Sequence, residues 1–181
     1  NYNVTGVNDT YIGYQAGKGA SGQSNSQNTG VGATALEDIT TGASNAAVGR
    51  EAGRNITSGG TNTMIGTSTG DTLTTGGGNI CIGYGANVNA SSAGNEIVIG
   101  NNTTGHGDNK VVIGTTSTTA WHPADDAGVD LGSSSYRFAN LYTADIQLSN
   151  EGANGNEVDG TTGNWTLQEG KDDIFIINRK T

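Results

Sequence analysis

The stretch NTMIGTSTGDTLTTGGG, residues 62–78, is rich in Thr and Gly and almost devoid of large apolar side chains. Its composition is that of a flexible linker, but its Met-Ile-Gly step has counterparts along the chain. An apolar residue followed by glycine recurs in DTYIG, NTGVG, NAAVG, NTMIG, NICIG, EIVIG and KVVIG. The stretch is therefore one unit of an internal repeat.

The spacing of the repeat is regular, because the glycines of these steps are separated by 19, 17, 17, 17, 17 and 14 residues. The consensus N-T-x-[IV]-G-x-x-A-x-x-x-[IL]-T-[ST]-G indicates a short strand, a glycine corner, a second short strand and a turn. This pattern predicts an all-β chain that forms a β-solenoid of about 17-residue coils, with roughly six coils in a rod about 30 Å long. The repeat positions are Ile12, Gly13, Val31, Gly32, Val48, Gly49, Ile65, Gly66, Ile82, Gly83, Ile99, Gly100, Ile113 and Gly114.

The composition fits a thin architecture. Of 181 residues 32% are hydrophobic, 31 are Gly and one is Pro, so neither a thick core nor a collagen-like segment is expected. The net charge of −9 comes without basic runs, which argues against nucleic-acid binding. No apolar run approaches the roughly 20 residues of a membrane span, so we expect no membrane insertion. The lone Cys81 excludes an intrachain disulfide.

Side-chain alternation within each strand predicts an interface between chains. The residues that flank the strand centre, such as Ile80 and Ile82, face one side, and the central residues face the other. Both sides are apolar or small, yet a single coil has one interior. We therefore expect identical chains to cover the second side in a homotrimer. The predicted trimer contacts are the central residues Tyr11, Ala47, Met64, Cys81, Val98 and Val112.

The segments NTGVGATAL and NAAVGREAG resemble the YadA-like head repeats of trimeric autotransporter adhesins and the Gly-rich repeats of bacteriophage tail fibres. The resemblance covers about residues 8–114 and implies a trimer of left-handed parallel β-rolls. The 17-residue spacing is longer than that typical of the bacterial heads and favours the phage version. A second resemblance lies in DLGSSSYRFANLYTADIQL, residues 130–148, and is to a segment near the C-termini of many phage structural proteins. GNWTLQEGKDDIFIINRKT, residues 163–181, is similar to the closing β-element of cyanophage-type fibres.

The 17-residue spacing ends after Gly114, and large side chains return there. We expect a shaft over residues 1–114, a connector with an aromatic plug over 115–150 and a β-hairpin cap over 151–181. ADIQLS should form a strand, and NWTLQ and DIFIIN a hairpin about the turn EGKD. Since the chain starts at Asn1 without Met, we expect a fragment of a longer protein. The residues expected to plug and cap the last coil are Trp121, Tyr136, Phe138, Leu141, Tyr142 and Trp165.

The sequence contains little that indicates catalysis, and we expect no enzyme and no cofactor. His106 and His122 lack metal-ligand spacing. Glu37 and Glu51 lie in different coils, where a solvated face is a simpler interpretation than the carboxylate pair of a glycoside hydrolase. A calcium site is a lesser alternative to turn and capping roles for Asp125, Asp126, Asp130, Asp172 and Asp173.

The hypothesis that unites these observations is a virion structural protein, the distal part of a trimeric tail fibre. Its expected partners are two identical chains, other tail proteins and a host-surface receptor, either a polysaccharide or an outer-membrane component. Three alternatives stay open: a bacterial surface adhesin or extracellular filament, a polysaccharide depolymerase, and an ice-binding solenoid. The last is suggested by the recurrence of Thr10, Thr29 and Thr63, but Ala46, Ile80 and Ile97 interrupt that column.

Overall fold

The structure is a computed structural model that describes residues 6–124, 129–149 and 161–179. Within these ranges it contains strands and turns but no helix, and hence no helix that could cross a membrane. The chain divides into two compact units, Asn1–Trp121 and His122–Thr181. The predicted all-β class and β-solenoid are confirmed, and a small antiparallel sheet lies toward the C-terminus.

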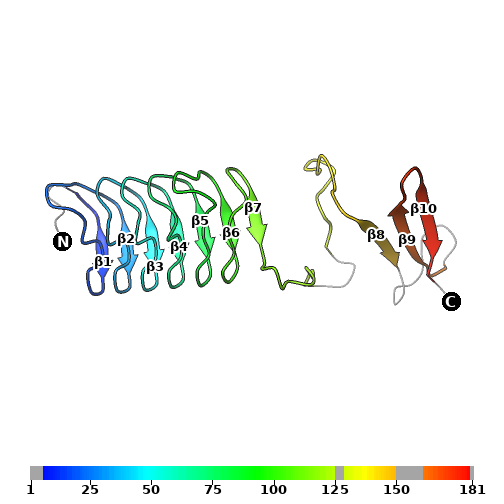
Figure 1. Ribbon diagram of the computed structural model, residues 1–181, viewed down its shortest axis with the longest axis horizontal. Coiled ribbons are helices and arrows are strands. Elements are labelled where there is room, and N and C mark those ends of the chain that lie inside the picture. Colours follow the sequence, from blue (N-terminus) through cyan, green and yellow to red (C-terminus); the bar gives the residue numbers. More distant parts are fainter. Residues whose placement is uncertain (1–5, 125–128, 150–160, 180–181) are drawn as a thin grey trace. The chain divides into compact units, whose positions relative to one another are not determined.

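The first unit is a solenoid in which every coil contributes one three-residue strand to a single parallel sheet (Figure 1). Each strand pairs with the next along the chain, and the central residue of one strand faces the central residue of the next, as Met64 faces Cys81. Successive coils therefore stack in one register. The strands are β1 (Thr10–Ile12), β2 (Thr29–Val31), β3 (Ala46–Val48), β4 (Thr63–Ile65), β5 (Ile80–Ile82), β6 (Ile97–Ile99) and β7 (Val111–Ile113).

The second run of each repeat does not form the predicted strand but a series of turns. Thr34 and Leu36 have φ angles of 56° and 51°, which break an extended chain. The coils are nevertheless joined there by backbone hydrogen bonds, for example from Leu36 N to Ala52 O at 3.0 Å and from Thr57 N to Thr74 O at 2.9 Å. Turns therefore replace the predicted second strand of each coil, and the hydrogen bonds between coils keep these backbone groups paired.

The glycine after each strand is required by its position. Gly32 and Gly49 both have a φ of 137°, a conformation that side chains other than glycine's rarely adopt. A Cβ atom at Gly32 would collide with the carbonyl oxygen of Gly49 in the next coil, and one at Gly49 with that of Gly66. The recurring glycine therefore lets adjacent coils approach closely enough to pair.

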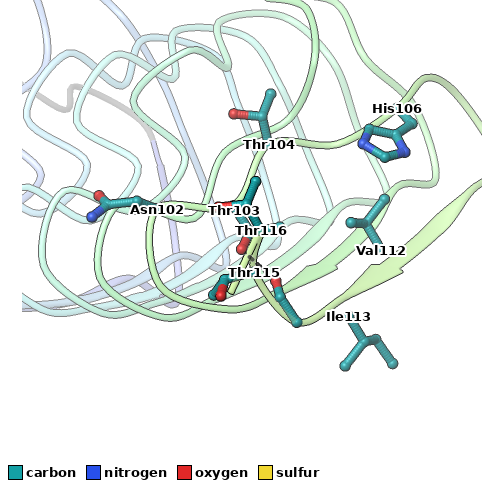
Figure 2. Close-up of a pocket in the computed structure, with 9 residues that line it drawn as sticks. Asn102, Thr103, Thr104, His106, Val112, Ile113, Thr115 and Thr116 are labelled. Atoms are coloured by element: carbon teal, nitrogen blue, oxygen red, sulfur yellow. Dashed lines mark hydrogen bonds between the residues drawn. The ribbon is translucent and has the colours of Figure 1, made fainter. Parts of the chain in front are cut away.

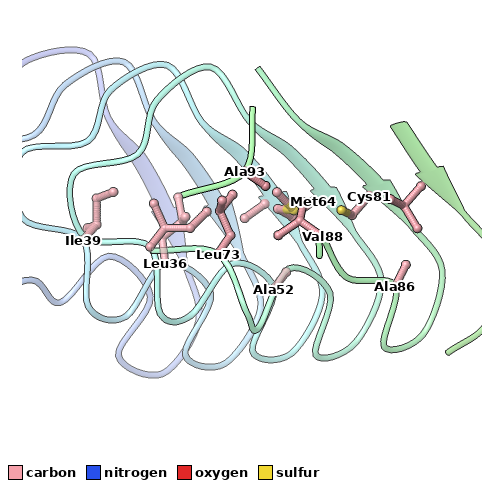
Figure 3. Close-up of a cluster of buried hydrophobic side chains, with 12 residues drawn as sticks. Leu36, Ile39, Ala52, Met64, Leu73, Cys81, Ala86, Val88 and Ala93 are labelled. Carbon is pink, nitrogen blue, oxygen red and sulfur yellow. The ribbon is translucent and has the colours of Figure 1, made fainter. Parts of the chain in front are cut away.

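The interior of the solenoid is lined by the central residues of the strands and by apolar residues from the turns (Figure 3). Met64, Cys81 and Val98 are completely buried, and Leu36 and Leu73 from the turns pack in the same cluster. By contrast, the flanking residue Ile65 is 43% exposed. The central side chains therefore form the core of each coil, and the flanking side chains point outward.

This arrangement contradicts the predicted trimer contacts, because their side chains point into their own chain. Ala47, Met64, Cys81 and Val98 have no exposed surface, Tyr11 packs against the core, and Val112 is half-buried at the last coil. Alternation in a strand shows which residues share a face, but not which face is inside. The prediction reversed the two faces.

Side-chain volume explains why the central positions are inside. The ring of Tyr11 is accommodated by Gly30, its partner on β2, where a Cβ atom would come within 2.9 Å of the ring. The Tyr11 hydroxyl donates to Asn25 Oδ1 at 2.7 Å, and burial raises the pKa of this tyrosine. Such compensation between large and small neighbours is typical of a packed interior.

A ladder of asparagine side chains, predicted from the column at Asn28, Asn45, Asn62 and Asn79, closes the coils. The Oδ1 atom of Asn45 accepts from both the backbone N and the Nδ2 of Asn62, each at 3.0 Å, and Asn62 Nδ2 also donates to Gly76 O at 3.0 Å. The ladder ends at Glu96, whose backbone N donates to Asn79 Oδ1 at 2.9 Å. The Glu96 side chain has no amide group with which to donate to Asn79 Oδ1, as each asparagine does to the one before it.

The second unit contains a three-stranded antiparallel sheet in the order β10-β9-β8. The strands are β8 (Asp145–Ser149), β9 (Asn164–Glu169) and β10 (Ile174–Asn178). The predicted strand in ADIQLS and the hairpin about EGKD are both present. The strand pairs with the hairpin, so the segments predicted as connector and cap share one sheet.

Candidate assembly interface

The outward side of the solenoid sheet is an apolar surface without charged residues. It is formed by the first and third residue of every strand, and we call it the outer face. Exposure is 61% for Ile12, 60% for Val111 and 43% for both Val48 and Ile65. The outer face consists of Thr10, Ile12, Thr29, Val31, Ala46, Val48, Thr63, Ile65, Ile80, Ile82, Ile97, Ile99, Val111 and Ile113.

The geometry of the strands makes this surface continuous. The seven strands pair with matching positions side by side, so that Val48 lies next to Ile65 and Ile65 next to Ile82. At the third positions, Ile and Val side chains about 4.8 Å apart form one unbroken aliphatic row, whereas the first-position row is Thr or Ala over β1–β4 and Ile or Val over β5–β7. A contiguous exposed apolar surface of this kind is uncommon on a monomeric protein and marks a site of association.

The signal that distinguishes the two faces was present in the sequence. The third position is always Ile or Val, whereas the central position varies from Gly30 through Ala47 to Tyr11. A uniform row of one shape suits contact with an external surface, while a row of varied volumes needs compensating neighbours inside the chain. The exposed side is therefore identified by its uniform side-chain size, since both sides are apolar.

The recurring threonines lie on the outer face, as an ice-binding surface would require. Thr10 and Thr29 are exposed, and Thr63 is partly exposed. The same row contains Ile80 and Ile97, however, and the adjoining row has no threonine. The outer face is thus mainly aliphatic, which suits burial against another apolar surface better than an ordered array of hydroxyl groups.

The aromatic residues expected to plug the last coil are exposed. Trp121, which belongs to the first unit, is 73% exposed and does not cover the solenoid end. In the second unit the exposure is 84% for Tyr136, 65% for Phe138, 64% for Leu141 and 92% for Tyr142. Trp165 lies on β9 and is 40% exposed. These side chains are thus available for contacts beyond their own chain.

The last coil contains a cavity of about 440 Å³ (Figure 2). Thr103, Thr104 and His106 come from the loop before β7, and Val112 and Ile113 come from β7 itself. Thr103 Oγ1 donates to Gly114 O, so this hydroxyl is already paired. Threonine hydroxyls and one imidazole beside two aliphatic side chains do not amount to a catalytic constellation.

The other candidate residues do not assemble into a chemical site. The carboxylate of Glu37 lies 3.7 Å from the Lys18 ammonium group, and that of Glu51 contacts the Arg50 guanidinium group. Each carboxylate therefore pairs with a positively charged side chain and not with the other carboxylate. Among the described residues no cluster of three His, Cys, Asp or Glu side chains could hold a metal ion. Asp125 and Asp126 lie outside the described residues.

Sequence reasoning missed one buried charged group, Glu96. It occupies the Asn column 17 residues after Asn79, and this interruption was the available signal. Glu96 is fully buried; its Oε2 accepts from Asn89 N at 3.2 Å, and its Oε1 has no hydrogen-bond partner among the described residues. This group lies inside the solenoid and is not part of the outer face.

Comparison with protein-family models, with curated proteins and with solved structures gives no significant match to this chain. The outer face is the feature of the solenoid that bears most directly on its function.

Proposed function

We propose that this chain is a structural subunit of a trimeric bacteriophage tail fibre, located in the virion, that attaches the particle to the host surface. The single observation that carries the proposal is the uncharged outer face, whose side chains are exposed or partly exposed along the whole length of the solenoid. A shaft with one such face is incomplete as a monomer, and identical chains supply matching surfaces.

Three identical solenoids complete each other when each turns its outer face toward a common axis. The branched side chains leave water, and each half-exposed Ile or Val then contributes about 1 kcal/mol. The turns, which carry most of the polar residues, remain outside. The number of chains follows from the resemblance of the repeats to trimeric fibre and adhesin families, and the longer coil favours the fibre.

Attachment would use the exposed turns or the C-terminal region rather than a deep pocket. Three copies of a weak contact on one rigid shaft raise the overall avidity without any strong individual site. A polysaccharide or an outer-membrane component of the host is the expected receptor. The other tail proteins would hold the fibre to the particle.

The alternative is a surface adhesin of a bacterium, whose head repeats this sequence also resembles. The segment DLGSSSYRFANLYTADIQL favours the phage interpretation because it resembles phage structural proteins. Antibodies raised against the chain and imaged by electron microscopy distinguish the two. Decoration of the distal ends of virion tail fibres supports the proposal, and decoration of bacterial cell surfaces without virions contradicts it.

A further inference from the structure

The C-terminal sheet has two chemically different faces. In an antiparallel sheet, paired residues lie on the same side, so Ile146, Leu167 and Ile176 form one cross-strand row. Residues two positions away along each strand join that side. We call this side of the sheet the apolar face. The apolar face consists of Ile146, Leu148, Trp165, Leu167, Ile174 and Ile176, with Glu169 and Asn178 at its ends.

The opposite face is mostly polar and makes its own contacts. Thr166, at its centre, is fully buried; its hydroxyl donates to Gln147 Oε1 at 2.8 Å and accepts from Arg179 Nε at 3.1 Å. Asp145 and Gln168 pair on the same side. This face is thus covered by its own long polar side chains, although Phe175 is 52% exposed there.

The apolar face has no such cover among the described residues. Leu148 is 51%, Ile174 77% and Ile176 68% exposed, and Trp165 is 40% exposed. Together with Ile146 and the partly exposed Leu167, these side chains present an area on the order of 500 Å², more than half of the roughly 800 Å² per partner of a standard interface. A three-stranded sheet needs its hydrophobic side packed against something to be stable in water.

We propose that this apolar face is a second interface between copies of the chain, in which the three C-terminal sheets pack their apolar faces together around Trp165. The inference rests on the proposed trimer and extends it from the solenoid to the second unit. Glu169 is the one charged residue on the face and lies at its edge, so identical faces meet without like charges at the centre. A polysaccharide ligand fits poorly, because the centre offers no side-chain hydrogen-bond acceptor.

Two adjacent residues on β10 provide a matched pair of variants. Ile176 lies on the apolar face and Phe175 on the opposite face, and both are exposed in the single chain. Ile176→Lys places a charge in the proposed interface, whereas Phe175→Lys places it in solvent. The full chain carrying Trp121→Phe keeps Trp165 as its one tryptophan, so its fluorescence reports on the apolar face directly.

The test measures iodide quenching of Trp165 together with molar mass by light scattering. We expect Trp165 in the trimer to be quenched several-fold less than an exposed tryptophan, Ile176→Lys to remove this protection, and Phe175→Lys to leave it unchanged. A trimer in which Trp165 is freely quenched overturns this inference alone. Equal effects of the two substitutions also overturn it. A monomeric mass overturns both this inference and the trimer.

Discussion

Cys81 shows what the thin interior does to an individual residue. It is the central residue of β5 and is completely buried among Met64, Val98 and other apolar side chains. Burial raises its pKa to about 12, and the nearby Glu96 acts in the same direction. The thiol is thus held in its neutral, unreactive form, as expected of a cysteine that fills space in a core.

The raised pKa of Cys81 predicts that the folded protein loses stability at alkaline pH. Because the unfolded thiol ionises near pH 9 and the folded one near pH 12, stability is retained below pH 9 and lost as the pH rises through this window. Between pH 8 and pH 10 the free energy of unfolding should fall by about 1 kcal/mol more in the wild type than in Cys81→Ala. Denaturant titrations at both pH values measure this, and parallel losses would refute it.

At the level of the element, the asparagine ladder connects the coils and Glu96 stops it. Each asparagine both accepts from and donates to its neighbours, whereas Glu96 receives one hydrogen bond at Oε2 and leaves Oε1 buried and unpaired. A buried polar group without a partner costs roughly 1–3 kcal/mol. The coil that contains Glu96 is therefore the weak point of the ladder.

Replacing the carboxylate by an amide of the same shape should relieve this cost. We expect Glu96→Gln to raise the free energy of unfolding at pH 7 by about 1–3 kcal/mol, because it removes a buried acceptor-only group and supplies a donor. Asp172→Asn, at an exposed position in the turn between β9 and β10, is the control and should change little. Thermal unfolding of both variants is the measurement. A destabilised Glu96→Gln protein would show that the carboxylate is needed where it is.

The elements also show what the sequence could and could not predict. The recurring apolar-glycine step located every strand of the solenoid, because stacking requires each coil to place a glycine such as Gly49 or Gly66 at the same close approach. It failed at the second run, where positive φ angles at residues such as Leu36 produce turns. It also reversed the two sides of the strand, since Met64 and Ile65 are both apolar and alternation has no sign. The varied side-chain volumes at the central positions, from Gly30 to Tyr11, were the sequence signal that marks the inner side.

At the level of the whole molecule, each of the two units exposes an apolar surface to solvent. The solenoid exposes Ile65 and its neighbours on the outer face, and the C-terminal sheet exposes Ile176 and its neighbours on the apolar face. Both surfaces lack charge at their centres. In the proposed trimer, one symmetry would bring both surfaces into contact with the same surfaces of identical chains.

Adjacent residues on β4 separate folding from assembly. Met64→Lys buries a charge inside the coil and should lower the melting temperature of the solenoid by more than about 10 °C, since an unpaired buried charge costs several kcal/mol. Ile65→Lys, on the outer face, should leave the circular dichroism spectrum unchanged but raise the concentration needed for assembly at least about tenfold. Melting curves and dilution series distinguish the two effects.

The most direct test of the proposed trimer is the molar mass of the full chain at micromolar concentration, measured by size-exclusion chromatography with light scattering. One chain has a mass of 18.3 kDa, so the proposed trimer has three times that value, about 55 kDa. A mass of 18.3 kDa would contradict it, because the outer face would then remain exposed to water in the stable form of the protein.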